Sequence, residues 1–346
     1  MTTSIMLKLA AGVAIGAVLP FLTDDYTQYI VNICLVYIVS AVGLNLVLGY
    51  AGQLSFAHSA FMGIGAYATG VLMVKVGMAF LPALILGGVI AALVGLVVGL
   101  PAVRVRGLYL ALVTIALMYA VSWVLLHWTD VTFGANGLNV PTPSVFGFTL
   151  ATEHDRYLVV FPIAVAMVAL AGMIVTSKLG RAFVMVRDIE LAAACNGLNV
   201  MLVKAQAFAI SAFFAGIAGG LFAVCVGFLV PHGFGLVSMI TQFAMVLLGG
   251  LGSITGAIIG AVFISLLPEL LRNAQWAQEI AYGVLMILVI VFMPNGIVGL
   301  LRQRGLLART AMINPLTDKL PKTPSPSPAV PTSGVFFATA ANRAGR

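Results

Sequence analysis

The sequence predicts an all-α integral membrane protein with about ten transmembrane helices, some of them broken by glycine, and with both termini in the cytoplasm. Of its 346 residues, 62% are hydrophobic and 8% are charged, whereas about a quarter of a soluble domain is charged. Apolar runs recur that approach the roughly 20 residues needed to span a bilayer as a helix. The basic residues gather in a few loops between these runs, so the net charge of +7 indicates membrane orientation rather than nucleic-acid binding.

Ten apolar segments are the expected spans. In chain order they are 5–22, 28–50, 54–74, 80–101, 107–128, 157–176, 205–229, 237–251, 254–270 and 278–293. The first lacks a small-x-small cleavage site before Thr23, so we predict an uncleaved span and not a signal peptide. The segments 237–251 and 254–270 are short and interrupted by glycine, and they either cross the membrane twice or form a re-entrant pair.

Basic residues orient these spans. Three clusters should be cytoplasmic because positive charge favours that side, and they are Arg104 and Arg106, then Lys178, Arg181, Arg187 and Lys204, then Arg302, Arg304 and Arg309. The acidic positions Asp24, Asp25, Asp130 and Glu153 fall in loops of the opposite parity. Ten crossings place every basic cluster on one side, whereas counting 237–270 as one crossing would place the last cluster outside.

Two regions differ from the spans in composition. We predict a membrane domain over 1–302 that includes a polar loop at 178–204, followed by a basic, Pro/Ser-rich tail over 303–346. Because such low-complexity sequence cannot form a packed core, the tail is predicted to be disordered. The outer loop 129–156 is long and rich in Gly, Pro, Asn and Thr, and it is a candidate surface for a soluble partner.

The chain carries no visible catalytic or cofactor-binding motif, so we do not expect an enzyme. Its three cysteines and four histidines lack disulfide-framework or metal-ligand spacing, and no phosphate-binding Gly-x-x-x-x-Gly-Lys-Ser/Thr motif occurs. The spans contain almost no acidic residues, which argues against a proton- or sodium-coupled carrier and favours an energy source on another subunit. An ion-coupled secondary transporter stays open as an alternative because broken helices alone can bind sodium. A membrane anchor or scaffold subunit is a third class.

Two glycine-rich segments should break helices on the cytoplasmic side. They centre on Gly49 and Gly52, and on Gly249, Gly250 and Gly252. Glycine there lets the backbone turn at membrane depth while neighbouring groups satisfy the freed amides. The offset of 200 between the two sets hints at an internal repeat, which is common in transport proteins.

Polar residues near the first break are candidates to line a translocation path. They are Asn45, Gln53, Ser55 and His58. His58 is the only histidine in the interior of a predicted span, and it fits either an interhelical hydrogen bond or a polar path lining. The other three share this ambiguity.

The loop 178–204 should contain a short helix. Asp188 is placed to cap it, and Glu190 in its first turn suits the helix dipole. Ala192 to Ala194 favour helix, and Gly197 supplies a left-handed stop. The helix would be about two turns, or roughly 12 Å, long. Docking into a partner's groove and lying at the membrane surface are both compatible with this pattern.

The segment from Glu190 to Gly197, Glu-Leu-Ala-Ala-Ala-Cys-Asn-Gly, resembles the Glu-Ala-Ala cytoplasmic loop of bacterial ABC importer permeases with one leucine inserted. The segments 43–58, 63–67, 248–253 and 294–300 are similar to the LivM-type family of branched-chain amino acid permeases. The similarity covers about residues 30–302 and leaves out the tail.

This resemblance implies a permease subunit in the bacterial inner membrane, importing branched-chain amino acids or a related solute. Its partners would be a homologous LivH-like permease, two ATPase subunits that bind the ATP, and a periplasmic binding protein. The residues implied to contact the ATPase are Arg187, Glu190, Ala192, Ala193 and Gly197. Cys195 and Asn196 depart from the family pattern. Urea and short-chain amides are alternative solutes, because similar permeases import them.

Overall fold

The computed structural model describes residues 24–102, 107–145, 148–270 and 284. The predicted spans 5–22 and 278–293 and the tail 303–346 lie outside the described residues. The same holds for the first and last basic clusters, which are Arg104, Arg106, Arg302, Arg304 and Arg309.

Helices make up most of the described chain, as predicted. The long helices are α2 (Asp25–Asn45), α3 (His58–Lys75), α4 (Phe80–Ala102), α5 (Leu108–His127), α7 (Glu153–Thr176), α10 (Val200–Val226), α11 (Leu236–Gly249) and α12 (Ile254–Leu270). Shorter ones are η2 (Leu46–Tyr50), α6 (Thr129–Thr132), η3 (Gly134–Asn136), α8 (Lys178–Asp188), α9 (Glu190–Cys195) and η4 (Pro231–Phe234). The strands are β1 (Leu138–Asn139), β2 (Ser144–Val145), β3 (Phe148–Thr149) and β4 (Phe228–Leu229).

All of the predicted spans that fall within the described residues coincide with helices. Six helical segments there are long and apolar enough to cross a membrane, namely Asp25–Tyr50, Phe80–Leu100, Tyr109–His127, Glu153–Thr176, Val200–Val226 and Pro231–Gly249. The helix α12 is shorter, and α3 is not among the six. The helix α10 begins five residues before the predicted span, because Lys204 is buried inside it and was read from its charge as part of a loop.

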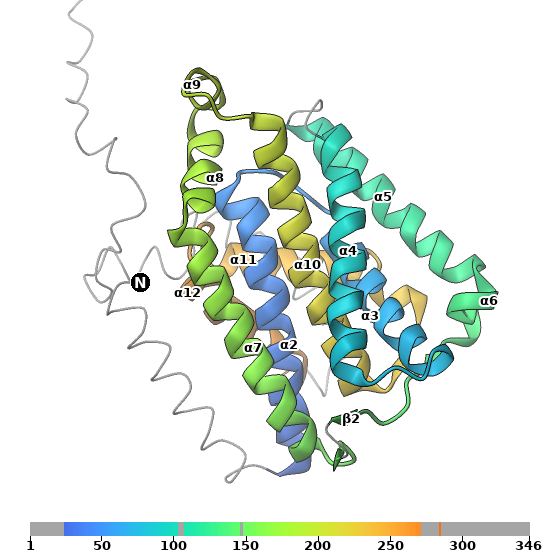
Figure 1. The fold of residues 1–346 in the computed structure, drawn as a ribbon. Coiled ribbons are helices and arrows are strands. Elements are labelled where there is room, and N and C mark those ends of the chain that lie inside the picture. The colour runs from blue at the N-terminus through green and yellow to red at the C-terminus, as the bar shows by residue number, and fades with distance from the viewer. Residues whose placement is uncertain (1–23, 103–106, 146–147, 271–283, 285–346) are drawn as a thin grey trace, which may run out of the picture.

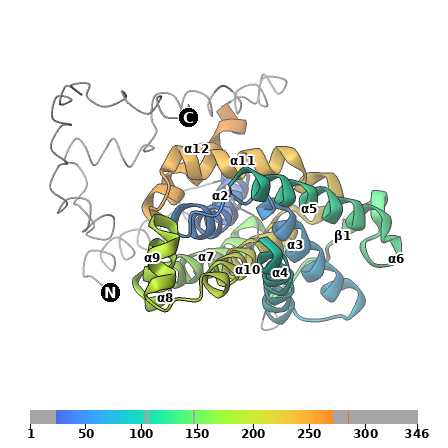
Figure 2. The same ribbon diagram turned by 90° about the horizontal axis from the view of Figure 1, so that it is seen from above.

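The helix α10 lies between α7 and α4 and packs on α2, α3 and α4 (Figures 1 and 2). Glycine allows this approach. A Cβ at Gly219 would lie 1.9 Å from the Met62 carbonyl oxygen of α3, and one at Gly65 would lie 2.2 Å from the Gly216 Cα. In a lipid bilayer the hydrophobic effect does not drive helices together. Close backbone packing of this kind therefore stabilises the bundle.

The helices α11 and α12 form an antiparallel hairpin that packs on α2 at the side away from α7 and α10 (Figure 2). A Cβ at Gly249 would lie 1.9 Å from the Gly256 oxygen, and one at Gly260 would lie 1.9 Å from the Met245 oxygen. The predicted pair 237–251 and 254–270 is therefore two separate helices joined by a turn.

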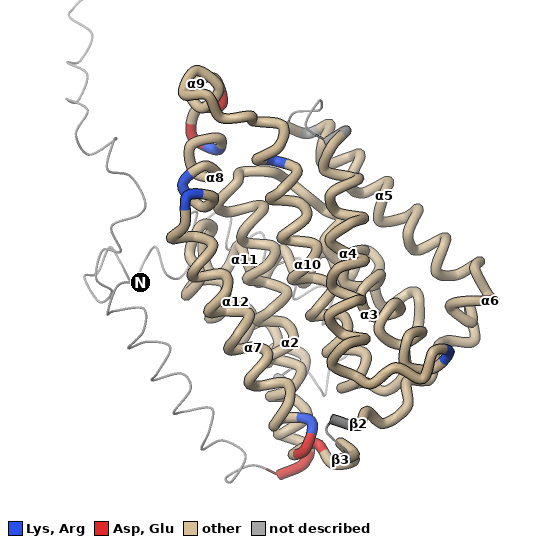
Figure 3. Tube along the Cα trace, in the orientation of Figure 1, with Lys and Arg blue, Asp and Glu red and all other residues tan. Residues whose placement is uncertain are grey.

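Charged residues concentrate at the two ends of the bundle (Figure 3). The α8 end, which we define as the end with α8 and α9, carries Lys178, Arg181, Arg187 and Lys204. At the opposite end Arg156 pairs with Glu153 at 2.5 Å, and the Asn32 amide donates to the Glu153 carbonyl at 3.1 Å. The outer loop is not irregular throughout, since β1 pairs with β4 and β2 pairs with β3.

The packing predicts that replacing glycine by alanine at two different positions changes the free energy of unfolding by unequal amounts. The Gly219→Ala variant must separate α3 from α10, so we expect a loss of about 2 kcal/mol or more in the free energy of unfolding. The matched control Gly172→Ala should be neutral or stabilising by up to about 1 kcal/mol, because a Cβ there meets no atom within 4 Å. Thermal unfolding of the purified variants in detergent measures both, and equal losses would contradict this packing.

Candidate functional site

The predicted helix break after α2 is present. The helix widens into a π turn over Leu46–Tyr50, and residues 51–57 then have no regular secondary structure before α3 begins. Gly52 has a φ of +66°, a conformation that favours glycine. The Ala51 amide donates to the Leu46 carbonyl at 3.1 Å, and the Gln53 amide donates to the Val47 carbonyl at 2.9 Å. These bonds satisfy part of the backbone that the break frees.

The irregular segment 51–57 descends into the bundle. His58, at the start of α3, contacts the Ser40 carbonyl, and Ser40 precedes Tyr50 by ten residues, or about 15 Å of helix. Irregular backbone at such depth is tolerated only where protein buries it or where it lines a water-filled cavity. Here Ser55 and His58 are buried, and the Phe56 amide donates to the Thr114 hydroxyl of α5 at 3.0 Å.

His58 joins three helices. Its Nε2 lies 2.9 Å from the Ser40 carbonyl oxygen of α2, and its Nδ1 lies 3.1 Å from the Ser211 hydroxyl of α10. Because a carbonyl only accepts, Nε2 carries the proton and Nδ1 accepts from Ser211. Only 2% of the residue is exposed. The arrangement fits the interhelical hydrogen bond rather than a path lining.

Asn45 joins the two glycine breaks. Its Nδ2 donates to the Ser253 carbonyl at 3.0 Å, and its Oδ1 accepts from the Gly252 amide at 2.9 Å. A Cβ at Gly49 would lie 2.3 Å from the Gly252 nitrogen, so only glycine allows this contact. The turn between α11 and α12 has positive φ angles at Gly250 and Gly252. Both breaks lie at one end, as predicted, and the structure adds that they touch.

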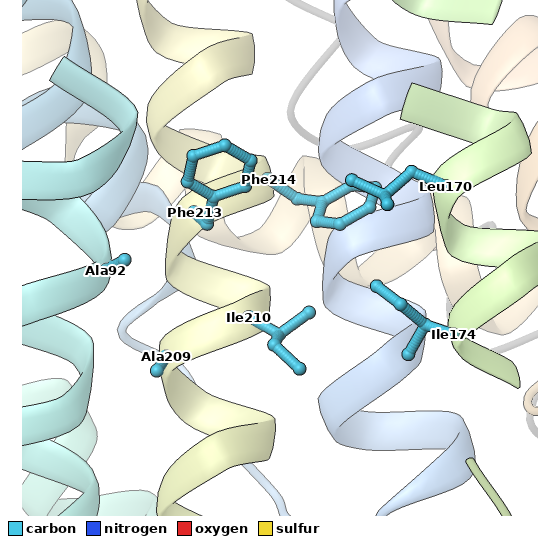
Figure 4. A pocket seen from close by; sticks show the side chains of 7 residues that line it. All are labelled: Ala92, Leu170, Ile174, Ala209, Ile210, Phe213 and Phe214. Carbon is cyan, nitrogen blue, oxygen red and sulfur yellow. The ribbon is translucent and has the colours of Figure 1, made fainter. Parts of the chain in front are cut away.

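The remaining path candidates, Gln53 and Ser55, do not line the cleft that the structure describes. Gln53 is half-buried and donates to the Ala51 carbonyl at 3.1 Å, while Ser55 is buried. A cleft of about 260 Å³ lies between α4, α7 and α10 (Figure 4), and its lining is apolar throughout: Ala92, Leu170, Ile174, Ala209, Ile210, Phe213 and Phe214. None of the four candidates reaches this cleft, and it offers no partner for a charged group. Their role in a path stays a prediction.

The loop 178–204 contains two helices instead of one. The expected helix is α9, which begins at Glu190, and Gly197 follows it with a φ of +79° as predicted. The capping role of Asp188 was wrong, because Asp188 ends α8 and pairs with Arg187 at 2.9 Å. The helix α8 was missed because its charges suggested a loop. The apolar spacing of Phe183 and Val186, which are buried, was the available signal.

The helix α9 projects from the end of the molecule (Figure 1). Glu190 points back toward the bundle, with its carboxylate 2.9 Å from the buried Lys204 ammonium. Ala193 is buried and Ala192 is half-buried, whereas Gly197 is exposed. The most exposed apolar side chain here is Leu191, at 76%, with Ile189 beside it at 62%. Sequence reasoning missed both, because the leucine was read only as an insertion.

Arg187 reaches inward as well. Its Nη1 donates to the Gly49 carbonyl at 2.8 Å, and its Nε donates to Asp188 at 3.0 Å. Its side chain is 26% exposed. The structure therefore places this predicted docking residue against the first glycine break.

Comparison with known proteins gives a consistent result. The family model described as the permease component of the branched-chain amino acid transport system matches residues 26–293. The high-affinity branched-chain amino acid permease protein LivM of Salmonella typhimurium is 33% identical over 86% of this chain and 76% of its own length. LivM of Escherichia coli K12 is 32% identical with the same coverage. LivH of Escherichia coli K12 is 28% identical over 76% of this chain and 91% of its own length. No solved structure matches the chain.

The buried position of His58 predicts a structural effect of its removal. The His58→Leu variant leaves the Ser40 carbonyl and the Ser211 hydroxyl buried without this partner, so we expect a loss of about 3 kcal/mol in the free energy of unfolding. Gln53→Leu is the control, because the Gln53 side-chain amide bonds only to the nearby Ala51 carbonyl, and this variant should change stability little. Unfolding in detergent measures both. Unchanged stability of His58→Leu with a raised KM for uptake would instead support the path lining.

Proposed function

The chain belongs to the branched-chain amino acid transport permease family, and we propose that it forms half of the translocation path of a bacterial ABC importer for branched-chain amino acids. The observation that carries this proposal is the family match over residues 26–293, which covers all the described long helices except the first residue of α2. Urea, short-chain amides or another small solute are the alternative cargo within the same architecture.

A second permease is the first expected partner. The chain is similar both to LivM and to LivH proteins, which supports pairing of this chain with a homologous LivH-like subunit. We further infer two ATPase subunits and a periplasmic binding protein as partners. Since the sequence carries no phosphate-binding motif, the energy for import would come from ATP bound by the ATPases and not by this chain.

The α8 end would face the cytoplasm. It carries the basic side chains of α8 and Lys204 of α10, and basic residues favour that side. This orientation would place both termini in the cytoplasm, with about ten spans, and would locate the protein in the bacterial inner membrane. The opposite end, with the paired strands of the outer loop, would then receive the binding protein.

The ATPase contact would lie on α9. An apolar residue that is 76% exposed, as Leu191 is, is expected to find a partner when it stands at the charged end of a membrane protein. Glu190, Ala192, Ala193 and Gly197 would then shape the helix and its ends, and Leu191 and Ile189 would supply the apolar contact. Binding of a helix through its apolar face in a partner's groove is a known mode of recognition.

The acidic residues of the described helices favour a subunit of this kind over an ion-coupled carrier. Each of them lies in the first or last turn of a helix or in the short helix α6, as with Glu153 in α7 and Glu269 in α12. Coupling ions are usually bound by carboxylates or broken helices deep in the membrane. The one deep break described here, at 51–57, is joined at its His58 end to other helices, because His58 contacts Ser211 and the Phe56 amide donates to Thr114.

Reconstitution tests the proposed function. Proteoliposomes that hold this chain, a LivH-like permease, both ATPases and the binding protein should accumulate labelled leucine only when ATP is present on the ATPase side. Omitting any one component should abolish uptake. Uptake by the chain alone under an ion gradient would contradict the proposal, and ATP-driven uptake of urea or an amide in place of leucine would change the cargo.

The ion pair of Glu190 predicts a rescue. In Glu190→Lys a second ammonium faces the buried Lys204, so α9 should shift, and we expect ATP-driven uptake to fall about tenfold, with the protein still in the membrane. The double variant Glu190→Lys with Lys204→Glu restores opposite charges and should recover much of the uptake. Uptake unchanged in the single variant, measured in the same proteoliposomes, would contradict a coupling role for α9.

A further inference from the structure

Arg187 stands where three separate parts of the chain meet. From α8, its guanidinium donates to the Gly49 carbonyl at 2.8 Å. A Cβ at Gly52 would lie 2.5 Å from the Arg187 Cγ, and one at Gly252 would lie 3.4 Å from its Nη1. The arginine stem therefore covers the first glycine turn, and its charged end also reaches the second.

The acceptor at this junction is a carbonyl that the helix break sets free. Gly49 lies in the last π turn before the irregular segment 51–57, and the last carbonyls of a helix have no partner within it. A cation at this place also suits the negative end of the helix dipole. Asp188 holds the guanidinium from the other side at 2.9 Å, which orients Arg187 toward Gly49.

The two glycine turns are joined to each other by direct contacts. Asn45 bonds to both Gly252 and Ser253, and the Gly49 backbone packs directly on Gly252. A displacement at either turn is thus passed to the other. It also passes into α2 and into the α11–α12 hairpin, because the turns belong to those elements.

The helix α9 is connected to this junction by a short path. Only Ile189 separates α8 from α9, and it is extended, with φ −147° and ψ 95°. Phe183 and Val186 anchor α8 by burial, and Arg187 follows them directly. Arg187 therefore lies only three residues before the start of α9, so a displacement of α9 would act on it directly.

We propose that Arg187 is the positioning residue that transmits movement of α8 and α9 to the two glycine turns, and so controls the end of α2 and the α11–α12 hairpin. The contact between Arg187 and Gly49 holds these elements together in the state described. Withdrawal of the guanidinium frees the Gly49 carbonyl and lets the turns move away from α8. This inference rests on the proposed function, in which ATPase subunits move α9.

The test measures movement of the second turn in the assembled transporter. Spin labels replace Leu251 in that turn and Val97 on α4, which are 46% and 66% exposed, in a Cys195→Ser background that removes the exposed native cysteine. The distance between the labels is compared with and without trapped ATP. Arg187→Met keeps the aliphatic stem and removes the hydrogen bonds. Arg181→Met is the matched control, since Arg181 also lies on α8 but bonds only to Thr176 at 3.4 Å.

We expect ATP to change the label distance in the parent and in Arg181→Met, and to leave it unchanged in Arg187→Met while the ATPases still co-purify. Leucine transported per ATP hydrolysed should fall about tenfold in Arg187→Met. Arg187→Lys keeps the positive charge but lacks the planar fork of guanidinium donors, so it should be intermediate, and it replaces Arg187→Met in the test if that variant does not fold. A full distance change with normal coupling in both Arg187 variants would overturn the proposal. Failure of the ATPases to bind the parent would overturn the proposed function, and this inference with it.

Discussion

The structure depends on one constraint, which is that backbone polar groups freed by a helix break inside the bundle must find partners there. The chain breaks after α2 and sends residues 51–57 down to His58. Side chains from other elements then supply the bonds. Arg187 binds the Gly49 carbonyl, and Thr114 binds the Phe56 amide. The break therefore ties α5 and α8 to the region around α2 instead of loosening it.

Close approach of neighbouring backbones, which glycine allows, is the second requirement for these contacts. At Gly219, Gly249 and Gly260 a Cβ would lie 1.9 Å from a backbone oxygen of the neighbouring helix. The same property that lets helices touch in lipid brings Gly49 against Gly252, so that Asn45 can bond across the contact. The packing residues and the junction residues thus belong to one network.

Local pattern predicted much of the fold from the sequence. Apolar length located the long helices, glycine located both breaks, and Glu190, the three alanines and Gly197 located α9. What it did not reveal depends on distant contacts. Lys204 looks solvated until Glu190 is seen beside it, and Arg187 looks like a surface cation until Gly49 is found 138 positions earlier in the chain. The spacing of 200 residues between Gly49 and Gly249 suggested an internal repeat, but the sequence did not indicate that the two glycine turns are in contact. For two path candidates, such distant contacts show that Asn45 bonds to the turn between α11 and α12 and that His58 bonds to α10.

The α8 end combines a hydrogen-bonded junction with an exposed short helix, which suits a subunit that a docked partner moves. The native cysteines allow the most direct test, because Cys195 on α9 is exposed whereas Cys34 and Cys225 are buried. The measurement is the rate at which a membrane-impermeant maleimide labels Cys195 in inside-out vesicles, with and without the ATPase subunits. Docking on α9 predicts that labelling slows strongly when the ATPases are bound. An equal rate in both conditions would contradict the assignment of α9 as the docking helix.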